Sequence, residues 1–170
     1  MFLNYLKDFF IKKTLKNNLR NVKKEVFTSN IKTIGLLLDE SDFRHSKALI
    51  EELVSKGIDS ERIKIVVYRN KFKDKKIYSF PTFSKKHIDW KGDSKVDFLT
   101  EFIETEFDLL ISYYDVQKPI LKLITNQSKA KFKVGFASID KVINRWMINT
   151  SLSNYRLFVF ELFRYLKNIK

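Results

Sequence analysis

The stretch FDLLISYYDVQKPILKLITNQSKAKFKVGF, residues 107–136, decides the fold of this chain. Residues 107–114 form a short apolar and aromatic run of the kind that a parallel sheet buries on both faces. Pro119 then stands where the first turn of a helix tolerates proline, and the extended pattern resumes over 131–136. This order of strand, helix and strand predicts two parallel strands with a helix that crosses one face of their sheet.

Further stretches of the same kinds lie on both sides of this unit. Strands are predicted over 31–38 and 62–69, and 86–90 and 145–149 are candidates for a short edge strand and a final strand. Three further helices are predicted over 42–56, 96–105 and 154–168, the first with Ser41 as its N-cap and Gly57 as its end. The alternation predicts an α/β fold, a three-layer Rossmann-like sandwich with a mostly parallel sheet. Its predicted core comprises Ile34, Leu36, Leu38, Ile65, Val67, Leu109, Ile111, Val134 and Phe136.

The length of 170 residues suits one domain with a single core and is too short for two ordinary domains. We expect this Rossmann-like domain to span residues 31–170. Residues 1–30 precede it as a basic amphipathic helix. Apolar side chains recur there at helical spacing, at Leu3, Leu6, Phe10, Ile11, Leu15, Leu19 and Val22.

The formal net charge of +13 is segregated along the chain. Basic residues outnumber acidic ones by 7 to 2 in 1–30, by 11 to 3 in 62–95 and by 7 to 1 in 118–145. In contrast, 31–61 holds 4 basic and 7 acidic residues, and 96–117 holds 6 acidic residues and no basic one. Blocks of positive charge favour an anionic partner, such as RNA or a membrane surface. A general compositional bias towards lysine is the alternative.

Several function classes lose support from composition. The chain has no cysteine, which excludes thiol chemistry and disulfides, and its four glycines lie too far apart for a dinucleotide fingerprint or a P-loop. His45 lies one helical turn after Asp42, but this spacing is more typical of a surface ion pair than of a metal site. We therefore expect no cofactor and no metal. No apolar run is long enough to span a membrane and charges interrupt the N-terminal stretch, so we expect a cytoplasmic protein.

Carboxylates follow two of the predicted strands. Rossmann-like sheets bind ligands at the carboxyl ends of their strands, which makes Asp39, Glu40 and Asp115 the small-ligand candidates. If these acids converge, each should raise the proton affinity of the others, and Tyr113 and Tyr114 would wall the site. Acidic residues after strands are also ordinary helix caps and turn formers. No catalytic residue is assigned.

Lysines and aromatic rings alternate in residues 70–95, which we expect to form a long loop. Lysines neutralise phosphates and rings stack on unpaired bases, so this pattern is typical of RNA binding. The nucleic-acid candidates are Lys71, Lys73, Lys75, Lys76, Lys85, Lys86, Trp90 and Lys91. The alternative is a solvated charge run with rings packed inward. In the N-terminal stretch, the candidates for a membrane or partner contact are Lys12, Lys13, Lys16 and Arg20.

Two resemblances rest on quoted residues. FDLLISYYD, a helix and SKAKFKVGF resemble the N-terminal half of heptosyltransferase-type glycosyltransferases over about thirty residues. Together with IGLLLDESD at 34–42, FPTFSKKHIDWKG at 80–92, NRWMIN at 144–149 and FELFRYLKNI at 160–169, the chain resembles an uncharacterised family from Bacteroidetes known as a domain of unknown function. The first resemblance implies a Rossmann-like half of an enzyme. We expect a non-enzymatic basic module that binds RNA or an RNA-rich assembly, with a peripheral membrane module and a glycosyltransferase-like half as alternatives.

Overall fold

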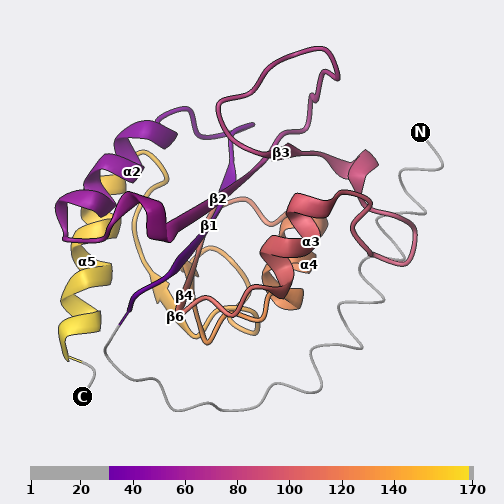
Figure 1. Cartoon of the computed structure of the whole chain (residues 1–170). Coiled ribbons are helices and arrows are strands. Elements are labelled where there is room, and N and C mark those ends of the chain that lie inside the picture. Colours follow the sequence, from indigo (N-terminus) through magenta and orange to yellow (C-terminus); the bar gives the residue numbers. More distant parts are fainter. Residues whose placement is uncertain (1–30, 169–170) are drawn as a thin grey trace.

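A computed structural model describes residues 31–168 and contains a six-stranded parallel sheet between two layers of helices (Figure 1). The strand order is β3-β2-β1-β4-β5-β6, so β1 (Ile34–Asp39) and β4 (Leu109–Tyr113) lie side by side at the centre. The strands outside them are β2 (Ile63–Tyr68), β3 (Thr82–Phe83), β5 (Phe132–Phe136) and β6 (Trp146–Ile148). The predicted fold class, an α/β sandwich of Rossmann-like architecture, is confirmed.

The helices cover the two faces of the sheet in pairs (Figure 1). On one face lie α2 (Ser46–Ser55) and α5 (Tyr155–Asn168), and on the other lie α3 (Asp97–Glu104) and α4 (Pro119–Gln127). Short 3-10 turns are present at η2 (Ser60–Arg62) and η3 (Lys85–His87). Neighbouring residues of β4 show the alternation of a strand, because Tyr113 packs on Phe158 of α5 while Ser112 shares a hydrogen bond with Thr125 of α4.

The core lies where the sequence pattern places it, with one exception. Eight of the nine predicted core residues are buried, whereas Ile65 on β2 stays partly exposed. The reason is the short edge strand, since β3 pairs only with Val67 and Tyr68. Among the described residues, no strand therefore covers the outer edge of 63–66.

The helix predicted over 42–56 begins later than expected, at Ser46, so the assignment of Ser41 as its N-cap is wrong. The carbonyl of Asp39 accepts a hydrogen bond from the N–H of Phe43 at 3.0 Å, which forms a turn and buries the Phe43 ring. Ser41 Oγ instead accepts a hydrogen bond from the N–H of Asn70 at 2.9 Å. The other end agrees with the prediction, because Gly57 follows α2 with a φ of 92°.

The edge strand proposed over 86–90 is also wrong. The edge is β3 at Thr82–Phe83, after which the N–H of Ser84 donates to Nδ1 of His87 at 3.1 Å and the chain curls into η3. Ile88 returns only to an isolated bridge with Ser94. The final strand expected within 145–149 is present as β6, whereas the predicted N-terminal helix over 1–30 lies outside the described residues.

Candidate functional site

The carboxyl ends of β1, β2 and β4 meet at the point where the strand order reverses, the usual ligand position in this architecture. Asp39 ends β1 there and is 1% exposed. Its Oδ1 accepts a hydrogen bond from the N–H of Ser41 at 3.0 Å, and its Oδ2 forms an ion pair with Nζ of Lys118. Lys118 precedes α4, so a cation of the chain itself lies between the ends of β1 and β4.

Lys118 holds two carboxylates at once, since its Nζ also donates to Oδ2 of Asp42 at 2.7 Å. Burial disfavours the charge on Lys118, but the hydrogen bonds to Asp39 and Asp42 outweigh it, so the pKa of Lys118 is raised. The ammonium group also lies 5.6 Å from the centre of the Tyr68 ring. Lys118 therefore stays protonated and neutralises the acid at the end of β1.

Glu40 also has partners for both of its carboxylate oxygens. Its Oε1 accepts a hydrogen bond from Oγ of Ser46 at 2.6 Å, and its Oε2 forms an ion pair with the guanidinium of Arg69. Arg69 follows β2 and lies 5.2 Å from the centre of the Tyr78 ring. Its Nε is buried and has no hydrogen-bond partner among the described residues. Glu40 thus ties the ends of β1 and β2 to the start of α2.

Tyr113 ends β4, and Tyr114 and the third candidate acid, Asp115, follow it. Tyr113 donates to the carbonyl of Leu152 at 2.7 Å, whereas the hydroxyl of Tyr114 bonds to Thr125 of α4 at 2.8 Å. Burial, and then the charge of Asp115, raises the pKa of Tyr113; burial raises the pKa of Tyr114, with a further contribution from Asp39. The two buried rings thus belong to opposite faces of the sheet rather than to one wall.

Taken together, the contacts of Asp39 and Glu40 are structural in character. Asp39 and Glu40 each pair with a cation of the same chain and accept a hydrogen bond that shapes the backbone or a helix start. In 31–168, no group of three histidines, cysteines or acids could hold a metal ion. The geometry supports ties between strand ends better than a cation site or an acid/base pair.

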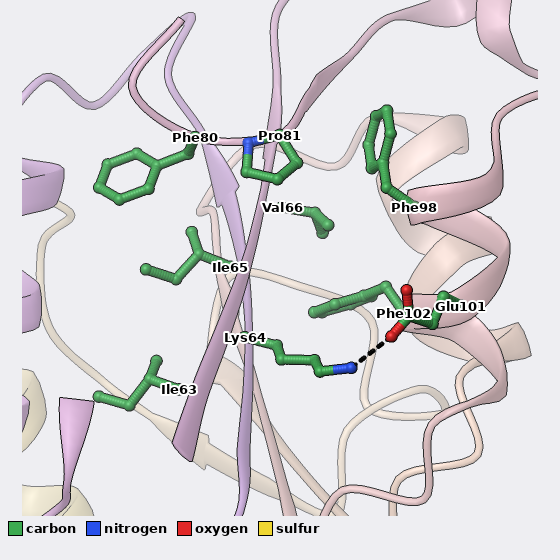
Figure 2. A pocket seen from close by; sticks show the side chains of 9 residues that line it. All are labelled: Ile63, Lys64, Ile65, Val66, Phe80, Pro81, Phe98, Glu101 and Phe102. Atoms are coloured by element: carbon green, nitrogen blue, oxygen red, sulfur yellow. Dashed lines mark hydrogen bonds and ion pairs between the residues drawn. The ribbon is translucent and has the colours of Figure 1, made fainter. Parts of the chain in front are cut away.

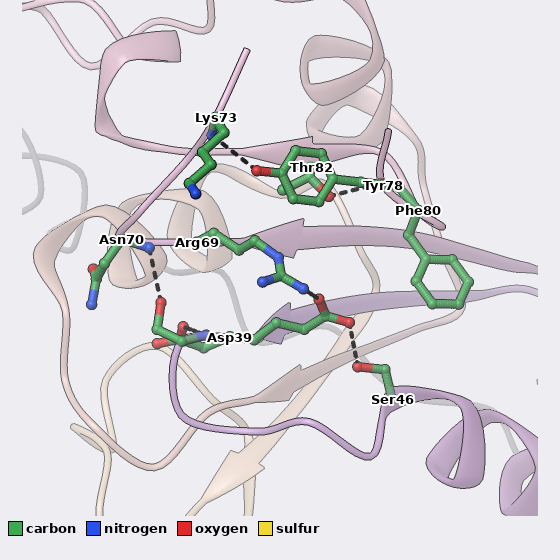
Figure 3. Close-up of polar contacts among 10 residues, drawn as sticks. Asp39, Ser46, Arg69, Asn70, Lys73, Tyr78, Phe80 and Thr82 are labelled. Carbon is green, nitrogen blue, oxygen red and sulfur yellow. Dashed lines mark hydrogen bonds and ion pairs between the residues drawn. The ribbon is translucent and has the colours of Figure 1, made fainter. Parts of the chain in front are cut away.

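The connection from β2 to β3 rises above this edge and carries four of the seven predicted lysines. We call residues 70–78 the lysine loop, in which Lys71, Lys73, Lys75 and Lys76 are all exposed. Phe72 and Tyr78 stack inside the loop with their ring centres 5.2 Å apart, and the hydroxyl of Tyr78 accepts a hydrogen bond from the N–H of Lys73 at 2.9 Å (Figure 3). The lysines therefore project from a loop with an aromatic interior.

The short turn η3 joins the lysine loop and brings two more of the predicted residues with it. Lys86 forms an ion pair with Asp74 and lies 4.5 Å from the centre of the Phe72 ring. His87 contacts the same ring edge-on at 4.7 Å. The hydrogen bond from Lys86 lowers the pKa of Asp74. Lys85 and Lys86 thus belong to the same basic surface as the loop.

Trp90 and Lys91 lie on the next turn, which is built around Asp89. Asp89 Oδ1 accepts hydrogen bonds from three successive N–H groups, at 2.8 Å from Lys91 and at 2.9 Å from Gly92 and from Asp93. The Trp90 ring is 62% exposed, with Nζ of Lys91 5.2 Å from its centre. Gln127 at the end of α4 anchors this turn by donating to the carbonyl of Gly92 at 3.2 Å.

A model of a family described only as a family of unknown function (DUF6913) matches residues 7–169 of the chain. The chain belongs to this family. No curated protein and no solved structure matches it. The DUF6913 match covers every described element from β1 to α5 and most of the 30 residues before them. It also covers Lys12, Lys13, Lys16 and Arg20, which lie outside the described residues.

Sequence reasoning about this DUF6913 domain missed Lys118 and Arg69, the cations that hold Asp39 and Glu40. A signal was present, because Lys118 directly precedes the proline that starts a helix after the central strand. It also missed Asn144, which is buried without a hydrogen-bond partner among the described residues. Asn144 packs on Gly135, where a Cβ would lie 2.4 Å from its Nδ2. Nothing in the local pattern of residues 137–145 indicates this contact.

Proposed function

We propose that this DUF6913 domain is a non-enzymatic module that binds RNA or an RNA-rich assembly through the lysine loop and η3. The observation that carries the proposal is the concentration of exposed lysines on one aromatic-cored loop at the carboxyl edge of the sheet. Lys71, Lys73 and Lys75 make no ion pair with the described residues, so their charges are free for phosphates. Lysines neutralise phosphates by displacing counterions, which needs exposure and little competing carboxylate.

Aromatic groups beside these lysines support a single-stranded ligand. Bases without a pairing partner stack on aromatic rings, and each such contact contributes about 1–3 kcal/mol. The Trp90 ring beside Lys91 is 62% exposed, as a ring that contacts a base must be. We therefore assign phosphate contacts to the lysine loop and base stacking to Trp90.

The glycosyltransferase alternative has less support. It rests on a resemblance over residues 107–136, whose strands form the middle of the sheet rather than a set of ligand contacts. The acids at the carboxyl edge, Asp39 and Glu40, are neutralised by Lys118 and Arg69. A peripheral membrane module depends on Lys12, Lys13, Lys16 and Arg20, which lie outside the described residues. Within 31–168, no helix is long and apolar enough to cross a bilayer.

A salt titration of RNA binding tests the proposal. The full chain is titrated into a fluorescent single-stranded RNA at several salt concentrations, beside vesicles with anionic lipid. We expect RNA binding that weakens as salt rises, with a slope of about −0.7 in log K against log salt for each phosphate contact. Replacement of Lys71, Lys73, Lys75 and Lys76 by Gln should reduce the slope by about 3.

A matched variant separates a localised site from net charge. Lys32, Lys47, Lys141 and Lys167 are exposed lysines elsewhere in the described residues, and their replacement by Gln removes the same charge. This control should keep most of the slope. Absence of RNA binding at ~50 mM salt, where phosphate contacts are strongest, rejects the proposal. Binding to vesicles alone favours the membrane alternative.

A further inference from the structure

An apolar groove of about 310 Å³ runs along the outer edge of β2 (Figure 2). Phe98 and Phe102 of α3 line one side, and Phe80 lines the other, beside Ile65. Lys64 and Glu101 cross it with an ion pair of 2.5 Å. The groove extends from Phe80 and Pro81, just after the lysine loop, to Ile63 at the start of β2.

The groove exists because the connection between β2 and β3 contains no helix. Crossovers between parallel strands normally carry one, which would cover the sheet beside β2. Val67 and Arg69 donate their N–H groups to Pro81 and Phe83 at 2.9 and 3.0 Å, so the main chain of Ile65 faces the same edge. With β3 limited to two residues, that main chain and the partly exposed Ile65 side chain open into the groove.

We propose that residues 1–24 of the same chain occupy this groove, in place of the helix that the crossover lacks. Their sequence supplies what the groove lacks, a row of apolar residues at helical spacing that includes Leu15, Leu19 and Val22. The charges are complementary as well. Residues 1–30 hold 7 basic and 2 acidic residues, whereas α3 exposes three acids: Asp97, Glu101, which pairs with Lys64, and Glu104, which pairs with Lys129.

The point of attachment makes the contact reachable. Ile34 of β1 pairs with Ile63 of β2, so the chain before β1 enters the sheet beside the end of the groove. Adjacent strands lie about 4.8 Å apart. Residues 25–30 can extend over roughly 20 Å, several times that spacing. The family match begins at residue 7 and so includes most of this stretch.

Paramagnetic broadening tests the proposal on the full chain. The chain has no cysteine, so Asn17→Cys accepts a single nitroxide label on the side of the predicted helix away from Leu15 and Leu19. We expect loss of amide signal intensity at residues 63–66 and 98–102, and little loss on α2 and α5. Lys13→Cys provides a second label position, in case the first label itself blocks the contact.

Charge reversal at the rim supplies a paired control. Glu101→Lys should restore much of the lost intensity, because it places a cation against a basic segment; Glu51→Lys, an equal change on the exposed side of α2, should not. Absence of broadening at the groove with both labels, or broadening centred on another face, overturns the proposal. Broadening in a mixture of labelled chain with unlabelled isotope-enriched chain identifies a second copy as the occupant and overturns it too.

Discussion

Asp39 is a carboxylate that the fold removes almost completely from water, at 1% exposure, and then satisfies from within the chain. The N–H of Ser41 and the ammonium of Lys118 both point at it. A buried charge is tolerated only when it is paired and hydrogen-bonded. At the scale of single residues, the position that could bind a ligand in this architecture is thus held by an internal ion pair.

Replacement of Lys118 by Met should therefore destabilise the domain by about 3 kcal/mol, because it leaves the Asp39 charge buried without a cation. The double variant with Asp39→Asn should recover part of this loss, since the amide needs no counterion. Urea unfolding followed by circular dichroism measures both. Lys129→Met breaks the exposed pair with Glu104 and should change the urea midpoint little. If Lys118→Met and Lys129→Met lowered the urea midpoint equally, the buried ion pair of Asp39 with Lys118 would not stabilise the domain more than an exposed pair does.

At the scale of elements, the sequence predicts the central strands and the final strand β6, but neither the edge strand β3 nor the start of α2. Apart from Asp39 and Ser112, the runs that became β1 and β4 are apolar, because both faces of the central sheet are covered, and this pattern is readable without tertiary information. The start of α2 and the position of β3 depend on distant partners. Ser41 bonds to Asn70 across the loop, and Ser84 bonds to His87 in a turn. Local propensity contains neither contact.

The candidate site shows the same division. The exposed lysines of the lysine loop follow from the sequence, because a long polar connection stays at the surface. The pairing of Asp39 with Lys118 joins residues 79 positions apart, and it appears only once the strand order is known. Because the carboxyl ends of parallel strands lie at one edge of the sheet, the sequence predicts that the side chains there converge. It does not predict that Lys118 lies between them.

The contact between Lys133 of β5 and the end of α4 contributes to stability in a way that depends on pH. Lys133 of β5 donates to the carbonyls of Thr125 and Asn126 at the end of α4, at 2.8 and 3.2 Å, and burial lowers its pKa to about 8. An unfolded lysine titrates near 10.4. Between these values the unfolded chain binds more protons, so the contribution of Lys133 to stability rises with pH from about 8 to 10.

Lys133→Met should consequently flatten the dependence of stability on alkaline pH. Below pH 8, Lys133 of the wild type is protonated in both the folded and the unfolded chain, so the folded state bears the full cost of burying the charge. The difference in unfolding free energy between wild type and variant should shift by roughly 2 kcal/mol in favour of wild type between pH 7.5 and 9.5. Urea titrations at both ends of that range measure it. A constant difference would show that Lys133 keeps an ordinary pKa.

At the scale of the whole molecule, the excess positive charge concentrates on the basic surface without much compensation. Elsewhere in the described residues, acids pair with lysines at α3 and α4, as in Glu101 with Lys64 and Asp140 with Lys122. Within the lysine loop Asp74 is the only acid, and it pairs with Lys86. Like charges held close together repel one another, and the repulsion weakens as salt screens it. This repulsion lowers the stability of the free protein, and an anionic partner would reduce it.

Replacing Lys71, Lys73, Lys75 and Lys76 by Gln should therefore stabilise the protein while weakening RNA binding. At ~20 mM salt we expect the urea midpoint to rise by about 0.3 M, and at ~0.5 M salt the difference from wild type should vanish. The variant at Lys32, Lys47, Lys141 and Lys167 loses the same charge from scattered positions and should gain less. An unchanged or lower midpoint at low salt would mean that the loop lysines do not repel one another. That result is expected if the lysines reflect only a compositional bias and their charges are dispersed. A gain in stability with a loss of RNA affinity is the outcome expected of lysines held together for a polyanionic ligand.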